Sequence, residues 1–414
     1  MSNVPPRTRS YPARNCPVCG EISHRRLFRQ DFAGLSSGGL LSGYDVVVCA
    51  HCGCAFADDI PPQETFDAYY RDMSKYEYHH RDGLEPQWVL ERYRSLVRDL
   101  RPLLASPEAR ILDIGCANGG LLSCFKEAGF ANVLGVDPSA RCAEAAQRLH
   151  GVRVLTHPLS ELDAISDRFD MILLTGVLEH VRELGPPLRS IRRILADGGS
   201  LCIEVPDATA FAEHPNAPFQ EFSLEHVNFF SPASLANLMR PLGLSMTYHN
   251  CRPEQLSRDA NEPDVLAVFK PTAESGPLVP DTDCEAALLR YIRQCQGTEQ
   301  RVRNIISDLA TTARPILVWG AGTNTLRLLA TSDLGTANIV AFIDSNANFA
   351  GKKLLDKPIL LPAQLAGHNE PILICSWVYQ REIELQIRQQ LRAPNPVIRL
   401  YHAAAGDESP ALAA

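Results

Sequence analysis

Two segments of this chain share a pattern that restricts the folds open to it. Each has a short apolar strand, a glycine-rich turn, a helix and a second strand that ends in aspartate. Asp137 lies 24 residues after Asp113 in the first segment, and Asp344 lies 24 residues after Gly320 in the second. This order is typical of α/β folds that bind nucleotides at the start of the helix. The sequence therefore predicts two separate nucleotide-binding-like folds.

The rest of the sequence predicts three domains. Residues 1–75 are rich in cysteine, glycine and turns, residues 76–275 alternate helix-like and strand-like stretches, and residues 276–414 begin with a helical connector. Two or three domains is the expectation for a chain of 414 residues. The predicted fold class is α/β, with a small N-terminal domain, a central Rossmann-like domain and a C-terminal Rossmann-like domain.

Composition excludes several classes of partner. The formal net charge is −8 and no basic block occurs, whereas nucleic-acid binding needs clustered lysine and arginine. No apolar run is long enough to span a bilayer, and no apolar core follows the N-terminal arginines as in a signal peptide. The 13 cysteines are mostly single within apolar stretches, which fits a reducing compartment. We expect a cytoplasmic protein that binds neither nucleic acid nor membrane.

Four cysteines near the N-terminus form two C-x-x-C-G knuckles. Cys16 and Cys19 form the first, and Cys49 and Cys52 form the second, with 29 residues between Cys19 and Cys49. Four thiolates in a tetrahedral array are what a structural zinc site requires, and such a site keeps no open position for catalysis. The alternative is a pair of redox dithiols. We predict structural zinc, a staple that a segment this small needs to fold.

The turn in the middle segment predicts a ligand site. The strand Ile111–Ile114 leads into the turn, and a helix is predicted from near Leu121. Gly115 and Gly119 allow a ligand to approach the backbone closely. An acid at the tip of the second strand, here Asp137, is where a Rossmann-type fold holds ribose hydroxyls. An NAD site is the alternative, but its G-x-G-x-x-G fingerprint is not matched here.

These residues resemble a class I S-adenosylmethionine (SAM)-dependent methyltransferase. The resemblance implies that the turn holds the methionine end of SAM, that Asp137 holds the ribose, and that the loop THPLSEL flanks the adenine. The segment FDMILLTGVLEHV resembles the strand whose end faces the transferring methyl. The implied cofactor-binding residues are Asp113, Gly115, Cys116, Ala117, Gly119, Asp137, Pro138, Pro158 and Leu159.

The whole chain resembles the sugar C-methyltransferases that act on nucleotide-linked deoxysugars. The two cysteine knuckles, YYRDMSKYEYH, the glycine turn, EHVNFFSPASL and VWGAG carry the resemblance. It implies a zinc-binding domain, a methyltransferase domain and a C-terminal Rossmann-like domain, in a monomer or homodimer. It also implies an active site with Tyr76, Glu225 and His226, where a base enolises a keto-sugar before its carbon is methylated. Histidine suits that role because it titrates near neutral pH. His180 is a further candidate for contact with the substrate.

Other hypotheses stay open at this point. The sequence Gly176-Val-Leu-Glu-His180 departs from that sugar family and is closer to ordinary small-molecule methyltransferases, which allows methylation of an oxygen instead. Ser223 stands where the family has a tyrosine. The second strand–turn–helix segment could hold the nucleotide of a nucleotide-sugar, or could serve only as a wall and dimer surface. A non-catalytic, zinc-stabilised scaffold is the third possibility.

Overall fold

The computed structural model describes residues 9–34, 39–72, 85–214, 216–255, 257, 260–274 and 276–401, so the predicted site residue Tyr76 lies outside the described part. The chain forms two compact units. The first comprises Met1–Gln30, Leu40–His214 and Leu224–Ile292, and the second comprises Asp31–Gly39, Pro215–Ser223 and Arg293–Ala414. The predicted division into three domains stays a prediction. Within the described ranges, no helix is long and apolar enough to cross a membrane.

A small sheet at the start of the first unit connects the cysteine segment to a distant loop. Its strand order is β1-β2-β3-β9. The bounds are β1 (His24–Asp31), β2 (Gly43–Cys49), β3 (Ala55–Asp58) and β9 (Asn228–Phe229), and helix α1 (Gln63–Asp72) follows β3. Strand β9 pairs with β3 in antiparallel register, with Phe56 opposite Asn228. Because β9 begins two residues after His226, this pairing fixes the backbone beside the candidate base.

The main sheet of the first unit has seven strands in the order β10-β11-β8-β7-β4-β5-β6. Neighbouring strands are parallel from β8 to β6, and β11 pairs antiparallel with both β8 and β10. The strands are β4 (Ile111–Ile114), β5 (Val133–Val136), β6 (Val154–Leu155), β7 (Phe169–Thr175), β8 (Leu195–Pro206), β10 (Leu244–Gln255) and β11 (Asn261–Pro271). The helices of this unit are α2 (Gln87–Leu100), α3 (Gly120–Glu127), α4 (Ala140–His150), α5 (Gly185–Ile194) and α6 (Pro232–Met239). The order confirms a Rossmann-like α/β fold, in which the order of successive strands reverses between β4 and β7.

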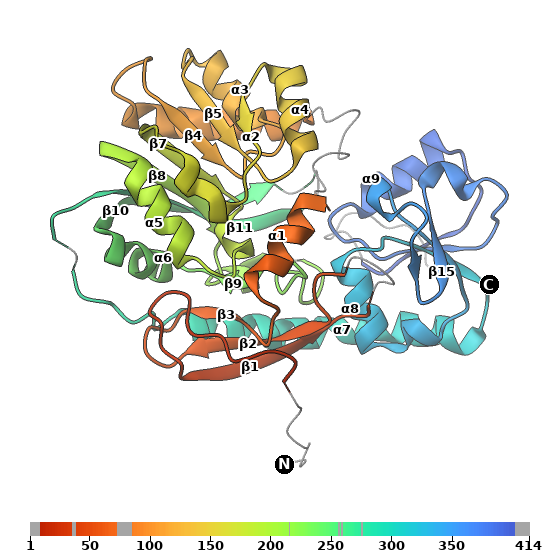
Figure 1. The fold of residues 1–414 in the computed structure, drawn as a ribbon. Helices are drawn as coiled ribbons and strands as arrows, with labels where there is room; N and C mark the ends of the chain where they lie inside the picture. The colour runs from red at the N-terminus through yellow and green to blue at the C-terminus, as the bar shows by residue number, and fades with distance from the viewer. Residues whose placement is uncertain are drawn as a thin grey trace. The chain divides into compact units, whose positions relative to one another are not determined.

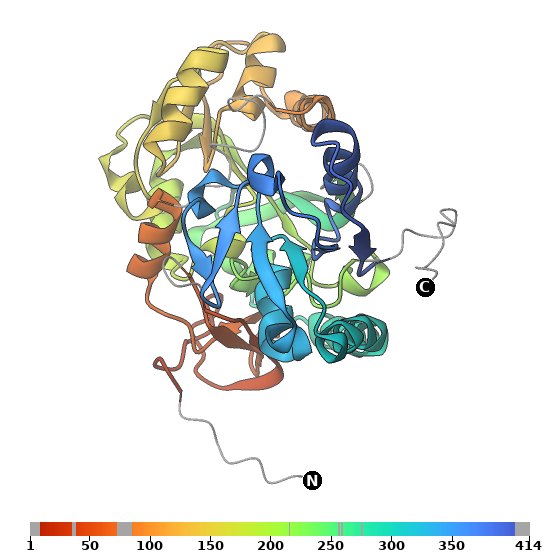
Figure 2. The same cartoon turned by 90° about the vertical axis from the view of Figure 1, so that its right-hand side faces the viewer.

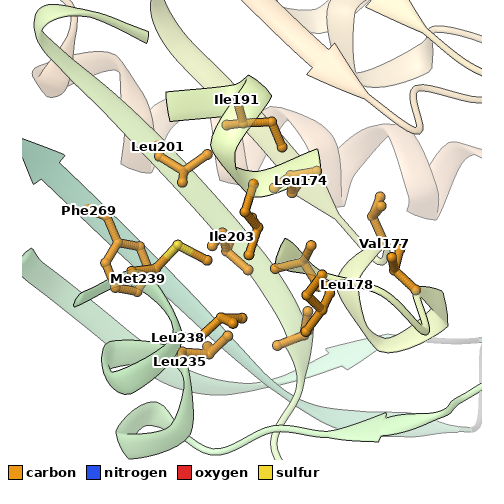
Figure 3. Packing of buried hydrophobic residues seen from close by; sticks show 14 of the residues in the cluster. Leu174, Val177, Leu178, Ile191, Leu201, Ile203, Leu235, Leu238, Met239 and Phe269 are labelled. Atoms are coloured by element: carbon orange, nitrogen blue, oxygen red, sulfur yellow. The ribbon is translucent and has the colours of Figure 1, made fainter. Parts of the chain in front are cut away.

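Helices lie on both faces of this sheet (Figure 1). Alternating side chains of the central strands supply two apolar cores, one on each face. Met171 and Leu173 pack into the core that α2, α3 and α4 cover, whereas Ile172 and Leu174 pack into the core that α5 and α6 cover. Figure 3 shows part of the second core, where Ile203 of β8 lies among residues of α5, α6, β7 and β11. Strands buried on both faces explain the continuous apolar runs in the sequence.

The second unit has its own, mostly parallel sheet, which is drawn in cyan to blue in Figure 2. The order is β14-β15-β13-β12-β16-β17. The strands are β12 (Ile316–Trp319), β13 (Ile339–Ile343), β14 (Lys353–Leu354), β15 (Lys357–Leu360), β16 (Ile372–Ile374) and β17 (Val397–Arg399). The helices are α8 (Thr323–Thr331) and α9 (Gln380–Leu385), and α7 (Cys284–Thr312) runs from the first unit into the second. The predicted helical connector is α7, and the predicted strands PILVW and NIVAFI are β12 and β13.

Candidate active site

A pocket opens in the first unit where β4, β5 and β7 end. It is lined there by Ile114 and Gly115 after β4, Val136 and Asp137 after β5, and Thr175 and Gly176 after β7. In a doubly wound sheet, ligands bind outside the carboxyl ends of the strands at the point where the strand order reverses. The pocket therefore lies where the fold itself predicts a ligand.

Gly115 brings the backbone to the pocket in a form that other residues adopt poorly. Its φ is +78°, and a Cβ built on it would lie 2.6 Å from Cγ2 of Val177. A β-branched side chain such as valine has little rotamer freedom with which to move away. Both the dihedral angle and the space thus favour glycine, as the sequence predicts for a turn that a ligand approaches closely.

Asp137 ties the second strand to the glycine turn. Its Oδ2 accepts a hydrogen bond from the backbone N–H of Ala117 at 2.9 Å, and its Oδ1 accepts one from Ser139 at 2.9 Å. A carboxylate has about four acceptor positions, so hydroxyl donors from a ribose could be accepted as well. Asp137 lines the pocket and is 8% exposed. This arrangement fits the predicted ribose contact.

The other predicted cofactor residues fall into two groups. Pro138, Pro158 and Leu159 line the pocket, as do Gly115 and Asp137. Asp113, Cys116, Ala117 and Gly119 form the strand end and turn behind it and are not among the lining residues. All nine stay predictions as cofactor contacts.

Asp113 is a buried carboxyl group, 3% exposed. Burial and, to a smaller extent, the charge of Asp137 raise its pKa to about 8. At neutral pH, Asp113 is therefore mostly protonated and can donate a hydrogen bond. Cys116 packs against Gly135, where an added Cβ would lie 2.4 Å from the Cys116 Sγ. Asp113 and Cys116 are thus buried at the strand end and the turn, outside the lining of the pocket.

His180 stands at the pocket edge, in the short 3₁₀ turn η5 (Leu178–His180) that follows β7. Its Nδ1 lies 2.9 Å from the Tyr70 hydroxyl and 3.2 Å from the backbone oxygen of Glu225. Its Nε2 lies 3.6 Å from Oε1 of Glu179, which is 3% exposed. The Glu225 carbonyl oxygen and the Glu179 carboxylate are acceptors, whereas the Tyr70 hydroxyl can donate or accept. Protein groups thus orient both ring nitrogens of His180.

The structure brings the two Glu-His pairs of the sequence together. The rings of His180 and His226 meet edge to face, with centroids 4.9 Å apart. Glu225 lines the pocket, and its Oε1 accepts a hydrogen bond from Tyr69 at 2.9 Å. The nearest ligand atoms of Glu179, His180 and His226 all lie within 4.8 Å of one another. Such a group can share and move a proton, and its donor types could also hold a divalent cation.

Helix α1 contributes a face of the pocket that the sequence analysis missed. Gln63, Asp67 and Tyr70 all line it. Their spacing of i, i+4 and i+7 places them on one side of the helix, and this periodicity could have indicated a shared role. Tyr69 of the same helix donates its hydroxyl to Glu225.

The four predicted zinc ligands form a compact cluster. The Sγ atoms of Cys16 and Cys52 are 3.5 Å apart, as are those of Cys19 and Cys49, and all four lie within 4.8 Å of one another. A tetrahedral zinc site with Zn–S bonds of about 2.3 Å requires sulfurs about 3.8 Å apart, so the donor set fits. The neighbour Cys54 is not part of this four-sulfur group; its Sγ contacts the oxygen of Ala55 and also interacts with Cys16.

The comparisons with known proteins agree with this geometry. Residues 87–249 match the family model of a methyltransferase domain. This part of the chain is a methyltransferase domain. The matched range contains the glycine turn, Asp137, the Glu179-His180 turn and Glu225, whereas α1, which also lines the pocket, lies outside it.

Curated relatives resemble only part of the chain. Ubiquinone biosynthesis O-methyltransferases of Nitrobacter winogradskyi and Bradyrhizobium sp. are 36% identical over 114 residues and 34% identical over 116 residues. These alignments cover 26% and 27% of this chain, and 42% and 45% of the relatives, so the chain spans less than half the length of either. A solved structure, the 1,6-didemethyltoxoflavin N1-methyltransferase of Burkholderia thailandensis with S-adenosylhomocysteine, is 23% identical. It covers 54% of this chain and 96% of its own, with a TM-score of 0.40.

Proposed function

We propose that this protein transfers a methyl group from SAM to a small molecule that must lose a proton in the reaction. The observation that carries the proposal is the contact of His226 with His180, which lines the pocket at the ends of β4, β5 and β7. Two imidazoles and a buried carboxylate form a group that can take up a proton near neutral pH.

The pocket residues fit SAM by their chemistry. Asp137 would accept hydrogen bonds from the ribose hydroxyls, Pro158 and Leu159 would contact the adenine, and Gly115 would let the methionine end approach the backbone. When bound, SAM supplies a methyl group already activated on a positively charged sulfur. The protein therefore needs to orient the acceptor and remove its proton.

We assign proton removal to His226 and an orienting role to His180. Both ring nitrogens of His180 face protein groups, namely Tyr70 and the Glu225 carbonyl on one side and Glu179 on the other. Glu179 would stabilise the positive charge that the histidines gain with the proton. Glu225, which Tyr69 holds in place, would orient the acceptor or bind one of its hydroxyls.

We propose a carbon beside the ketone of a nucleotide-linked deoxysugar as the acceptor. The support is the combination of a cysteine cluster, a methyltransferase domain and a second α/β unit, which resembles the sugar C-methyltransferases. In the second unit, Asp344 accepts a hydrogen bond from Ala321 N–H at 2.7 Å, as Asp137 does from Ala117. This repeated geometry supports nucleotide binding by the second unit. The alternative acceptor is an oxygen, as in the names of the two curated relatives.

Product analysis distinguishes the two acceptors. With a nucleotide-linked keto-deoxysugar and ¹³C-methyl SAM, we expect NMR to show the new methyl bonded to carbon. In deuterated solvent without SAM, the hydrogen beside the ketone should exchange, because enolisation precedes methyl transfer. A methyl on oxygen or nitrogen, or no exchange at that carbon, contradicts the carbon assignment and leaves the methyltransferase proposal standing.

We also propose that Cys16, Cys19, Cys49 and Cys52 bind one structural zinc ion. The sulfur separations and the Gly20 and Gly53 turns, with φ of +79° and +76°, support this assignment. The protein fills all four coordination positions, so the ion would stabilise the fold and take no part in methyl transfer.

A further inference from the structure

A buried arginine from the cysteine-bearing segment contacts both loops that carry the histidines. Arg14 is 4% exposed. Its guanidinium donates to the backbone oxygens of Ala57, Val227 and Arg182, and to Oδ1 of Asn228 at 2.8 Å. Arg182 lies two residues after His180 and Val227 lies one residue after His226, so a single side chain contacts the backbone beside each histidine.

Asn228 extends these contacts to the rest of the His180 turn. It is 2% exposed, and its Nδ2 donates to the backbone oxygens of Leu178 and Val181, each at 2.7 Å. Those two residues flank the Glu179-His180 pair on either side. Because Oδ1 of the same side chain accepts from Arg14, the asparagine amide is fixed in one orientation.

A backbone hydrogen bond completes the connection. The N–H of Val227 donates to the oxygen of Glu179 at 2.7 Å. Residues 178–182 and 225–228 are therefore joined through this bond, Arg14 and Asn228, and the edge-to-face contact of His180 and His226 lies directly beside the joint. A small shift of either segment changes how the two rings meet.

We propose that Arg14 and Asn228 are positioning residues that set the separation and orientation of His180 and His226. The importance of this for methyl transfer rests on the proposed function, whereas the positioning itself does not. Arginine suits the role because its rigid, planar fork can donate to several fixed acceptors at once. Burial and the nearby charge of Arg182 lower the pKa of Arg14 to about 9, as expected for a buried charge.

Two substitutions separate positioning from simple support of the fold. Asn228→Asp keeps the shape and the oxygen that faces Arg14, but it removes the Nδ2 donor to Leu178 and Val181. Arg14→Lys keeps the charge, but a compact ammonium cannot reach all the acceptors that the fork contacts. Asn237→Asp is the matched control, since Asn237 is also buried and bridges the backbone N–H and oxygen of Val279.

The test measures the imidazole ¹⁵N and ¹³C resonances of His180 and His226 in the folded protein, assigned with His→Gln variants. We expect both rings to shift in Asn228→Asp and in Arg14→Lys, and neither to shift in Asn237→Asp. SAM affinity should stay at the wild-type level, while kcat for methyl transfer falls about 100-fold with little change in KM. If Asn228→Asp does not fold, Arg14→Lys decides the result.

Unshifted rings in a folded Asn228→Asp or Arg14→Lys protein overturn the proposal. Equal shifts in Asn237→Asp also overturn it, because a general loss of stability then explains the effect. The resonances need neither SAM nor an acceptor. A wild-type protein that does not bind SAM would therefore refute the proposed function. The resonance shifts would still test whether Arg14 and Asn228 position the two histidines.

Discussion

His226→Ala is expected to lower the rate of methyl transfer about 10²- to 10⁴-fold, the usual contribution of a positioned general base. The alanine cannot accept the acceptor's proton, and His180 is already oriented by Tyr70 and Glu179. SAM affinity should not change, because His226 is not among the residues that line the pocket. Single-turnover transfer of ¹⁴C-methyl from SAM measures the rate, and calorimetry measures the affinity.

His249→Ala is the control for this experiment. His249 is exposed on β10, away from the pocket, so both the rate and the affinity should match the wild type. A His226→Ala protein that retains the wild-type rate contradicts the assignment of the base. If His180→Ala abolishes transfer and His226→Ala does not, His180 takes the proton and the two roles are reversed.

Cys52→Ser is expected to release the zinc ion and destabilise the first unit. Zinc bound at structural sites contributes on the order of 10 kcal/mol or more to folding in small domains, and three remaining thiolates hold it poorly. The small sheet that carries the cysteines pairs through β3 with β9, next to His226. We therefore expect metal content to fall, the thermal unfolding midpoint to drop, and methyl transfer to decline as the sheet loosens.

Cys54→Ser is the matched control for the zinc experiment. Cys54 is fully buried beside the cluster, but its Sγ contacts the oxygen of Ala55, a bond that a serine hydroxyl can also make. Elemental analysis should find one zinc per chain in the wild type and in Cys54→Ser. A wild-type protein found to contain no zinc, or a Cys52→Ser protein that retains zinc, contradicts the proposed site.

Local patterns in the sequence predicted much of the fold. The strand Ile111–Ile114 has the predicted bounds, and α3 begins at Gly120, one residue before the predicted start. A buried parallel strand, a glycine turn and a helix are each encoded by neighbouring residues, so short windows of sequence suffice. The same holds for the cysteine cluster, because each knuckle is a local turn closed by glycine.

The arrangement of the candidate site could not be predicted in the same way. Glu179-His180 and Glu225-His226 lie 46 residues apart in sequence, and their contact depends on the pairing of β3 with β9 and on the bond from Val227 to Glu179. Arg14 lies in an irregular segment two residues before the first cysteine knuckle, and no local pattern indicates a role for it. Its role follows only from the tertiary contacts that bury it.

Calorimetric titration of the purified protein with SAM tests the central claim most directly. We predict saturable binding of one SAM per chain, and an affinity at least tenfold weaker in Asp137→Ala, which loses the carboxylate that faces the pocket and closes the glycine turn. Equal binding by Asp137→Ala would place SAM elsewhere on the chain. No saturable binding to the wild type at millimolar SAM would contradict the account and favour a non-catalytic, zinc-stabilised scaffold.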